Sequence, residues 1–209
     1  IVDDEDQELE KYKKKYGDQV IVFSKAEYRG KFDMMDNIPK NNTVTFARNA
    51  IFDIAKQVCV DYFIMLDDDY SRFDYRYDGD LKWKATAIRN IDNVFDTLVD
   101  FLVNTDENVK CVAMAQAGDF IGGKKNGILN ALLRRRKVMN TFVCATNRPF
   151  RYIGRMNEDM NTYVYNSSIG SLFFTMPILS VNQRMTQSNP GGLTDMYLEF
   201  GTYVKSFYT

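Results

Sequence analysis

Hydrophobic residues recur along this chain in two patterns, and the two patterns alternate. Over residues 46–58 and 87–103 they are spaced three to four residues apart, which places them on one face of a helix and predicts two amphipathic helices. Continuous apolar runs predict buried strands at 19–23, 61–66, 110–115 and 141–145. Strands that alternate with helices favour an α/β architecture with a largely parallel sheet.

The other elements follow from weaker patterns. We expect helices at 5–16, 129–139 and 193–207, strands at 163–165 and 172–176, and loops at 28–42 and 118–127. Gly17 is suited to end the first helix, and Thr43 or Thr45 is suited to cap the helix at 46–58. Residues 70–84 follow neither period, so no element is predicted there. No linker divides the chain, and one domain over residues 1–209 is the simplest organisation.

Composition narrows the class of protein. The chain has 209 residues, of which 45% are hydrophobic and 26% charged, and this is the balance of a soluble globular protein. Its 27 Lys and Arg against 28 Asp and Glu argue against a uniformly basic DNA-coating protein. Histidine is absent, which excludes histidine triads, histidine bases and histidine metal ligands. Acid–base or metal chemistry must therefore rest mainly on carboxylates.

The cysteines and the apolar runs indicate the cellular compartment of the protein. Cys59, Cys111 and Cys144 are odd in number and far apart in the sequence, so we expect buried thiols in a reducing compartment. No apolar run approaches the roughly 20 residues of a membrane span, and no signal peptide is recognisable. We therefore expect a cytoplasmic protein. The chain opens at Ile1 on what reads as the end of a strand, so we expect residues to be missing before it.

An acidic cluster, Asp67-Asp68-Asp69, directly follows the strand predicted at 61–66. In an open α/β sheet, ligands bind at the carboxyl ends of the strands. Asp67 and Asp69 are two residues apart and point the same way in extended geometry, so they could hold Mg²⁺ or Mn²⁺ together with a substrate's phosphates. The alternative is a solvated acidic turn, and the residues alone leave both interpretations open.

Three further segments carry candidate chemistry, and each also has a simpler explanation. Asp3 and Asp4 end another predicted strand, or begin a helix, where acidic residues are favoured. Arg48 lies near a helix N-terminus, where it would meet a phosphate, or it is a surface arginine. Glu158 and Asp159 could supply a general base in a chain without histidine, or they form a charged turn.

Taken in order, these segments resemble the nucleotide-sugar glycosyltransferases of the GT-A fold, over roughly residues 1 to 165. The segments that carry the resemblance are Ile1-Val2-Asp3-Asp4, Ala47-Arg48-Asn49, Phe63-Ile64-Met65-Leu66-Asp67-Asp68-Asp69 and Asn157-Glu158-Asp159. A narrower similarity links the chain to the TET/JBP-associated DNA glycosyltransferases of bacteriophages, through Arg48-Asn49-Ala50-Ile51, the ending Met65-Leu66-Asp67-Asp68-Asp69-Tyr70, and Asn157-Glu158-Asp159-Met160-Asn161. That family is predicted to transfer sugars to hydroxymethylated pyrimidines in DNA.

The resemblance implies a single GT-A domain that lacks its first strand, with a donor-binding part at about 1–115 and an acceptor and catalytic part at about 116–209. It implies a metal-dependent and inverting transfer, with Mn²⁺ or Mg²⁺ and a nucleotide-sugar donor, by analogy a UDP-sugar. The roles it implies are the donor nucleobase and ribose for Asp3 and Asp4, the diphosphate for Arg48, the ribose or metal for Asp67, the donor for Asp68, the metal for Asp69, and the catalytic base for Asp159 with Glu158 as neighbour or substitute. Families of this fold often add a late histidine ligand, which this chain lacks, so metal ligation is lighter or is completed by water.

A DNA acceptor would need phosphate contacts, and the basic segments are the candidates. Lys124-Lys125 and, more densely, Arg134-Arg135-Arg136-Lys137 could hold phosphates, or they form a solvated helix face. The aromatic residues between 70 and 83 could stack a base or a sugar, or they pack in the core. Two alternatives remain open: a transferase acting on a polysaccharide or protein acceptor, and a catalytically inactive GT-A-like binding module.

Overall fold

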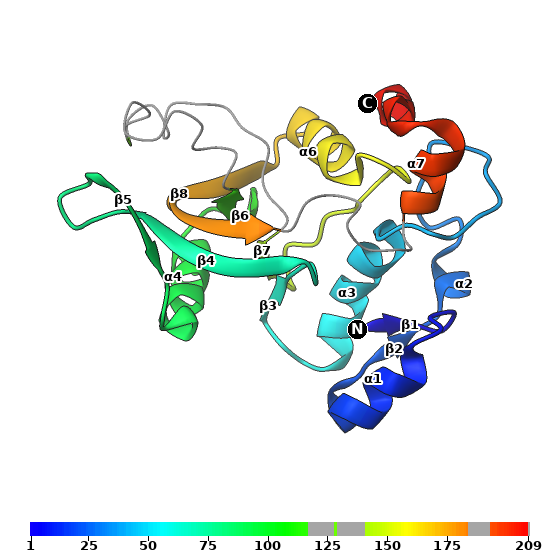
Figure 1. Ribbon diagram of the computed structural model, residues 1–209, viewed down its shortest axis with the longest axis horizontal. Coiled ribbons are helices and arrows are strands. Elements are labelled where there is room, and N and C mark those ends of the chain that lie inside the picture. The colour runs from blue at the N-terminus through cyan, green and yellow to red at the C-terminus, as the bar shows by residue number, and fades with distance from the viewer. Residues whose placement is uncertain (117–127, 129–140, 184–192, 209) are drawn as a thin grey trace. The chain divides into compact units, whose positions relative to one another are not determined.

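The computed structural model of the protein describes residues 1–116, 128, 141–183 and 193–208 (Figure 1). The loop predicted at 118–127, the helix predicted at 129–139, and with them the basic residues Lys124, Lys125, Arg134, Arg135, Arg136 and Lys137, lie outside the described residues. The chain forms two compact units. The first unit comprises the described parts of 1–60, 151–162 and 189–209, and the second those of 61–150 and 163–188.

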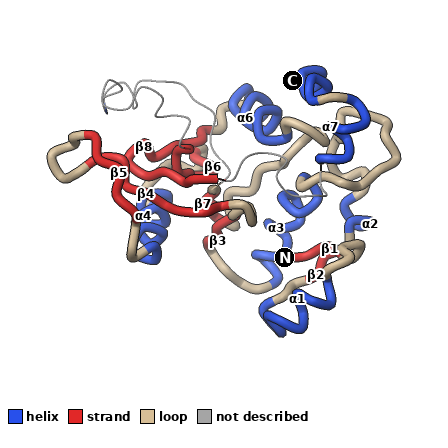
Figure 2. Tube along the Cα trace, in the orientation of Figure 1, coloured by secondary structure: helices blue, strands red, loops and turns tan. Residues whose placement is uncertain are grey.

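The second unit is built on a six-stranded sheet. Its strands are β3 (Tyr62–Met65), β4 (Tyr70–Tyr77), β5 (Trp83–Ala87), β6 (Val109–Gln116), β7 (Phe142–Ala145) and β8 (Leu172–Gln183), coloured as strands in Figure 2. The strand order is β3-β7-β6-β8-β4-β5. Among these described strands, only β6 and β8 pair in parallel, and the other neighbouring strands are antiparallel.

The prediction of a largely parallel sheet is therefore wrong, and residues 70–84 supply much of the reason. They form β4 and the start of β5, an antiparallel hairpin that needs no helical crossover. A register shift between Tyr75 and Tyr77 breaks the alternation of buried and exposed side chains in β4. A bulge turns the side chains that follow it to the other face of the sheet. The strand therefore lacks the strict alternation of hydrophobic and polar residues by which a strand is recognised in a sequence. The sheet is mixed, and it does not confirm the parallel sheet of a GT-A fold.

Helix α4 (Ile91–Val103) covers one face of this sheet with the apolar stripe that its sequence predicts. Val94, Leu98 and Leu102 are buried against side chains of β6, β7 and β8. The helix starts later than residue 87, because residues 83–87 are β5. Asn90 caps the helix by accepting a hydrogen bond from the Asn93 N–H at 3.4 Å.

The first unit opens with two short parallel strands, β1 (Val2–Asp3) and β2 (Val22–Phe23). Between and after them lie α1 (Leu9–Tyr16), the 3-10 turn η1 (Gly17–Gln19), α2 (Lys25–Tyr28) and α3 (Thr45–Gln57). Gly17 ends α1 with a φ of 55°, a conformation that favours glycine, as predicted. Aromatic side chains from β2, α2 and the loop at 28–42 pack on α3, and the core of this cluster is Phe23, Tyr28, Phe32, Phe46, Ala50 and Ile54.

The predicted threonine cap of α3 is wrong, and the reason matters for the candidate site. The helix begins after Val44, which makes no side-chain cap. The hydroxyl of Thr43 donates to the Arg155 carbonyl at 2.8 Å, and that of Thr45 donates to the Gly154 carbonyl at 2.7 Å. Both threonines are buried, and their hydroxyls satisfy backbone carbonyls of another segment. The Thr43 Oγ1 also accepts from the Thr45 N–H at 3.3 Å, but Thr43 lies one residue before the N-cap position.

The last elements are α6 (Glu158–Ser168), α7 (Thr194–Phe200) and the 3-10 helix η4 (Thr202–Tyr208). The strand predicted at 163–165 is wrong, because these residues belong to α6 and a short apolar run cannot separate strand from helix. The predicted strand at 172–176 is confirmed as the start of β8. Gly201, with a φ of 80°, divides the predicted helix at 193–207 into α7 and η4.

The expected burial of the cysteines is confirmed for two of the three residues. Cys111 and Cys144 are buried opposite each other on β6 and β7, and burial raises the pKa of the Cys144 thiol. Cys59 is exposed just after α3, so the prediction of a buried thiol is wrong there. Within the described ranges, no helix is long and apolar enough to cross a membrane.

Candidate functional site

The acidic cluster lies where the sequence predicts it, directly after β3 in the second unit. Asp68 is exposed, whereas Asp67 and Asp69 are half-buried. Asp68 and Asp69 form the turn that leads from β3 into β4, so the extended geometry predicted for Asp67 and Asp69 is wrong. Asp67 and Asp69 are nevertheless the two carboxylates of the cluster that are drawn toward the protein.

Asp69 is held by a relay of glutamines from two other strands. Gln116 ends β6 and its Nε2 donates to the Gln183 Oε1 at 2.8 Å; Gln183 ends β8 and its Nε2 donates to the Asp69 Oδ2 at 2.7 Å. The carboxyl ends of β6 and β8 therefore fix a side chain that follows the carboxyl end of β3. This is the edge of an α/β sheet at which ligands usually bind.

The second carboxylate oxygen of Asp69 is the unusual atom. Its Oδ1 is buried and has no hydrogen-bond partner among the described residues. Leaving a buried acceptor unsatisfied costs about 1–3 kcal/mol, and more for a charged group. A bound cation would remove this cost, so the atom fits a metal ligand.

The ligands around Asp69 fit a metal site in which water and substrate phosphates complete the coordination. In the parts of the chain that the structure describes, no three or more Asp, Glu, Cys or His side chains are grouped to hold a metal ion. Asp67 and Asp69 would supply two carboxylates. Mg²⁺ is commonly held by one or two carboxylates together with water and substrate phosphates, and the residues fit that mode.

The other acidic pair lies in the first unit, at the end of a segment that α3 clamps. The Asn49 side chain donates to the Tyr152 carbonyl at 3.0 Å and accepts from its N–H at 3.0 Å. One turn earlier, Thr45 bonds the Gly154 carbonyl. The polar side chains of α3 thus hold residues 152–155 much as a neighbouring strand would, and this fixes the entry to α6.

Arg48 and Glu158 complete the clamp as a buried ion pair. The Arg48 Nη1 lies 2.7 Å from the Glu158 Oε1, and the two side chains are 7% and 11% exposed. The guanidinium also lies over the Tyr152 ring, 5.5 Å from its centroid. The structure therefore brings together two of the predicted site residues, Arg48 and Glu158, as partners of each other.

Breaking this pair is expected to destabilise the protein strongly. In Arg48→Met, the Glu158 carboxylate stays buried without its guanidinium, and we expect a loss of about 3–5 kcal/mol in the free energy of unfolding. Urea titration followed by circular dichroism measures the loss. The double variant Arg48→Met/Glu158→Leu should recover much of it, because no charge is then left buried; additive losses would contradict the pairing.

Asp159 follows Glu158 in the first turn of α6 and is 8% exposed. Its Oδ1 accepts a hydrogen bond from the Met160 N–H at 2.7 Å. A carboxylate is favoured at a helix N-terminus. Burial, and then the charges of Glu158 and Asp159, raise the pKa of the Tyr197 phenol on α7. The charges of the acid pair therefore also affect a side chain of α7.

Asp3 ends β1 and Asp4 follows it in a turn, and both contact Lys25 at the start of α2. The Asp3 Oδ1 lies 2.8 Å from the Lys25 Nζ, and the Asp4 Oδ1 accepts from the Lys25 N–H at 3.1 Å. Hydrogen bonds from the Ser24 side chain and the Lys25 N–H lower the pKa of Asp4, which is exposed.

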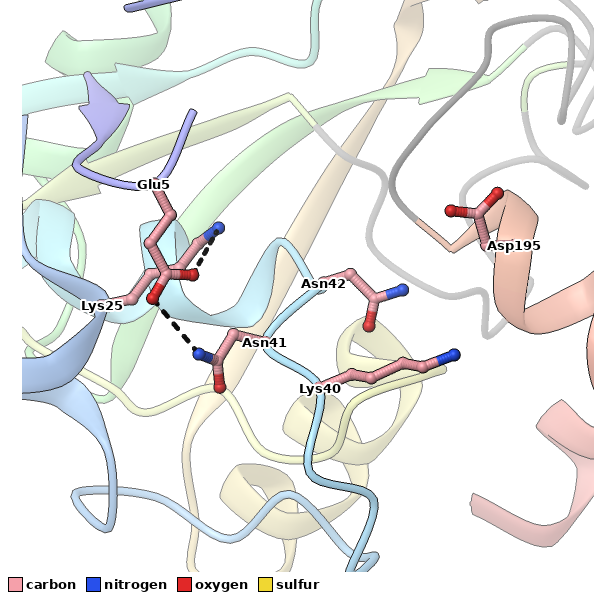
Figure 3. A pocket seen from close by; sticks show the side chains of 6 residues that line it. All are labelled: Glu5, Lys25, Lys40, Asn41, Asn42 and Asp195. Atoms are coloured by element: carbon pink, nitrogen blue, oxygen red, sulfur yellow. Dashed lines mark hydrogen bonds and ion pairs between the residues drawn. The ribbon is translucent and has the colours of Figure 1, made fainter. Parts of the chain in front are cut away.

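A polar pocket of about 390 Å³ adjoins Lys25 in the first unit (Figure 3). Its lining side chains are Glu5, Lys25, Lys40, Asn41, Asn42 and Asp195. Glu5 lies 3.9 Å from the Lys25 ammonium and accepts from the Asn41 amide at 3.4 Å, as the dashed lines mark. No motif in the sequence singles out this set, because it joins the turn after β1, α2, a loop and α7. Its mixture of donors and acceptors suits a ligand rich in hydroxyl and amide groups.

Arg155 is a further residue that the sequence did not reveal. Its side chain is almost fully buried and makes two bonds to the Asp36 carboxylate, Nε to Oδ2 at 2.7 Å and Nη2 to Oδ1 at 3.0 Å. The Tyr208 hydroxyl donates to the same carboxylate at 2.7 Å. Burial alone would raise the pKa of Asp36, but the bonds from Arg155 and Tyr208 outweigh it and lower the pKa.

The hydrogen bond from Tyr208 to Asp36 should make the stability of the folded protein fall at alkaline pH. Burial, and then Asp36, raise the pKa of Tyr208 to about 12. A raised pKa means that the folded state favours the protonated phenol, so this contribution is present below about pH 10 and is lost as the pH rises toward 12. We expect Tyr208→Phe to be less stable than the parent at pH 8, with a flatter decline above pH 10. Urea unfolding at pH 8 to 11 tests this, and equal slopes would contradict it.

The comparisons with known proteins are consistent with these findings. The family model described as TET-Associated Glycosyltransferase matches residues 1–192. No curated protein matches the chain, and no solved structure matches it. The matched stretch includes the acidic cluster after β3, the acid pair of α6, and the residues that close β1.

Proposed function

The chain belongs to the TET-associated glycosyltransferase family, and we propose that it moves a sugar from a nucleoside-diphosphate donor, a UDP-sugar, to a hydroxymethylated pyrimidine in DNA. The family makes the protein a glycosyltransferase. The donor, the metal dependence, the stereochemistry and the acceptor are the content of the proposal. The observation that carries it is the Asp69 carboxylate, which is fixed at a sheet edge with one buried oxygen that has no hydrogen-bond partner among the described residues.

On this proposal, Asp67 and Asp69 would hold Mn²⁺ or Mg²⁺ together with the diphosphate of the donor. When bound, the ion supplies positive charge next to the leaving diphosphate. The glutamine relay orients Asp69 so that one oxygen accepts from Gln183 and the other is available to a ligand. Asp68, which is exposed beside them, belongs to the donor side of the site.

The pyrimidine and ribose of the donor are assigned to the end of β1. Asp3 and Asp4 can accept hydrogen bonds from ribose hydroxyls and from a base N–H. The pocket beside Lys25 supports this assignment, because its two lysines and two acids are close to balanced in charge and suit a polar, neutral group.

The transfer itself needs one base. Asp159 takes the proton from the acceptor hydroxyl, whose oxygen forms a bond to the anomeric carbon of the sugar. The bond from that carbon to the diphosphate breaks, and the nucleoside diphosphate leaves with the electron pair. Attack from the face opposite the leaving group inverts the anomeric configuration. Arg48, which the resemblance assigns to the diphosphate, is bound to Glu158, so its role here is to fix the first turn of α6.

The DNA acceptor rests on the family and on the chemistry of the base. A substituent at C5 of a pyrimidine points into the major groove, where a hydroxymethyl group can be reached in a duplex. The basic run Arg134-Arg135-Arg136-Lys137 would hold the DNA phosphates on this proposal, with an affinity that falls as the salt concentration rises.

One reaction tests the proposal. The protein is incubated with Mn²⁺, a mixture of nucleotide sugars, and DNA that carries hydroxymethylcytosine or hydroxymethyluracil. The DNA is digested, its nucleosides are weighed by mass spectrometry, and released nucleoside diphosphate is assayed in parallel. We expect a pentose- or hexose-sized gain on one modified nucleoside. Diphosphate release without an adduct on DNA would overturn the DNA acceptor, and the absence of both signals would overturn the proposed transfer.

A further inference from the structure

Arg155 connects two parts of the first unit that the proposed reaction uses separately. Its guanidinium bonds both oxygens of Asp36 and donates to two backbone carbonyls of the same loop, that of Ile38 at 2.8 Å and that of Lys40. The loop then continues into Lys40, Asn41 and Asn42, which line the polar pocket and lie in succession in Figure 3.

The backbone around Arg155 is fixed as firmly as its side chain. The Gly154 N–H donates to the Asp33 carbonyl at 2.8 Å, and the Arg155 N–H donates to the Met34 carbonyl at 3.0 Å. On the other side, Thr43 just before α3 and Thr45 in its first turn donate to the carbonyls of the same two residues. Arg155 therefore cannot shift along the loop without breaking bonds on both sides of its own backbone.

Beyond Arg155 the chain passes directly to the acid pair. Asn157 has a φ of 51°, and its Nδ2 donates to the Lys205 carbonyl of η4 at 2.8 Å. Glu158 and Asp159 come next, at the start of α6. Only two residues separate the guanidinium-bearing position from Glu158, so a displacement of Arg155 is carried into the first turn of α6.

We propose that Arg155 is a positioning residue, which couples the loop that lines the pocket to the segment that carries Glu158 and Asp159. Its side chain is not among those that line the pocket, and its guanidinium meets Lys40 at the backbone carbonyl. It acts through Asp36 and the loop carbonyls on one side, and through its backbone on the other. Ligand contacts at Lys40, Asn41 and Asn42 would thereby favour one position of the acid pair.

An arginine is required for this role. Its planar guanidinium reaches both carboxylate oxygens and the two carbonyls at once, whereas a lysine ammonium offers a point charge with no such fork. Arg155→Lys therefore keeps the charge that Asp36 needs and removes the simultaneous contact with the loop. The matched control is Arg29→Lys, an exposed arginine of the first unit.

The kinetic test of this coupling rests on the proposed function. Sugar transfer is measured at a temperature at which circular dichroism shows every variant fully folded. We expect Arg155→Lys to raise the donor KM and also to lower kcat by about 10²-fold, because a displacement of about 1 Å in the reacting geometry has that effect. Arg29→Lys should match the parent. A lower Tm with unchanged kcat and KM would make Arg155 merely structural and would overturn the proposal.

A second measurement keeps the coupling separate from the proposed reaction. Hydrogen–deuterium exchange is followed in the parent and in Arg155→Lys, below the unfolding temperature of both. We expect amides at 36–42 and at 156–162 to lose protection together, while those of β1 and β2 keep it. If the parent transfers no sugar, the proposed function fails and this result still decides the coupling: a loss confined to one of the two segments would overturn it.

Discussion

Asp159→Asn is expected to lower kcat for sugar transfer by about 10²–10⁴-fold, the usual contribution of a positioned general base. The amide is close to the carboxylate in shape but cannot take the proton of the acceptor hydroxyl. Its oxygen can still accept the hydrogen bond that the Met160 N–H donates to the Asp159 Oδ1 at 2.7 Å. The first turn of α6 should therefore stay in place, and donor binding should survive.

The measurement is the single-turnover rate of transfer, with donor affinity followed separately by thermal stabilisation. Asp18→Asn is the matched control, because Asp18 is an exposed carboxylate of the same unit in η1. Full activity in Asp159→Asn would show that Asp159 is not the general base. Equal loss in the control would mean that the charge of the unit matters, rather than the position of one carboxylate.

The sequence predicted well those elements in which a single hydrophobic pattern continues through most of the helix or strand. In α4 the apolar stripe continues through the whole helix and is buried against the sheet, and β6 is a continuous apolar run. In β4 a bulge breaks the alternation, and the mixed aromatic and charged residues match no period. The parallel sheet was expected because strands and helices alternate, but strand order depends on pairings that no local pattern records.

The candidate site divides in the same way. Asp67 and Asp69 were predictable because they follow a strand, and strand ends are where α/β sheets bind ligands. The partners of Arg48 and Arg155 were not, since Glu158 and Asp36 lie 110 and 119 positions away along the chain. Such pairs form only when the chain folds, and neither carries a local signature. The resemblance named Arg48 and Glu158, but it did not reveal that they form an ion pair with each other.

Asp69→Asn is expected to lower the rate of transfer by about 10²–10³-fold, the usual cost of losing one group that stabilises developing charge. An asparagine oxygen can replace the Asp69 Oδ2 as acceptor for Gln183, whose Nε2 lies 2.7 Å away. The amide nitrogen would then stand in place of the buried Oδ1. The charge that fits a divalent cation is lost, while the glutamine relay from β6 and β8 is kept.

The same variant makes an opposite prediction for stability, and this separates a binding role from a structural one. Without metal, Asp69→Asn should be at least as stable as the parent, because it removes a buried charged oxygen that has no partner among the described residues. With Mn²⁺ and UDP, the parent should gain Tm and the variant should gain less. Asp80→Asn, an exposed carboxylate in the turn between β4 and β5, is the control. A variant that unfolds more easily without metal and still gains the parent's full shift with Mn²⁺ would show that Asp69 supports the sheet edge and does not bind the ion.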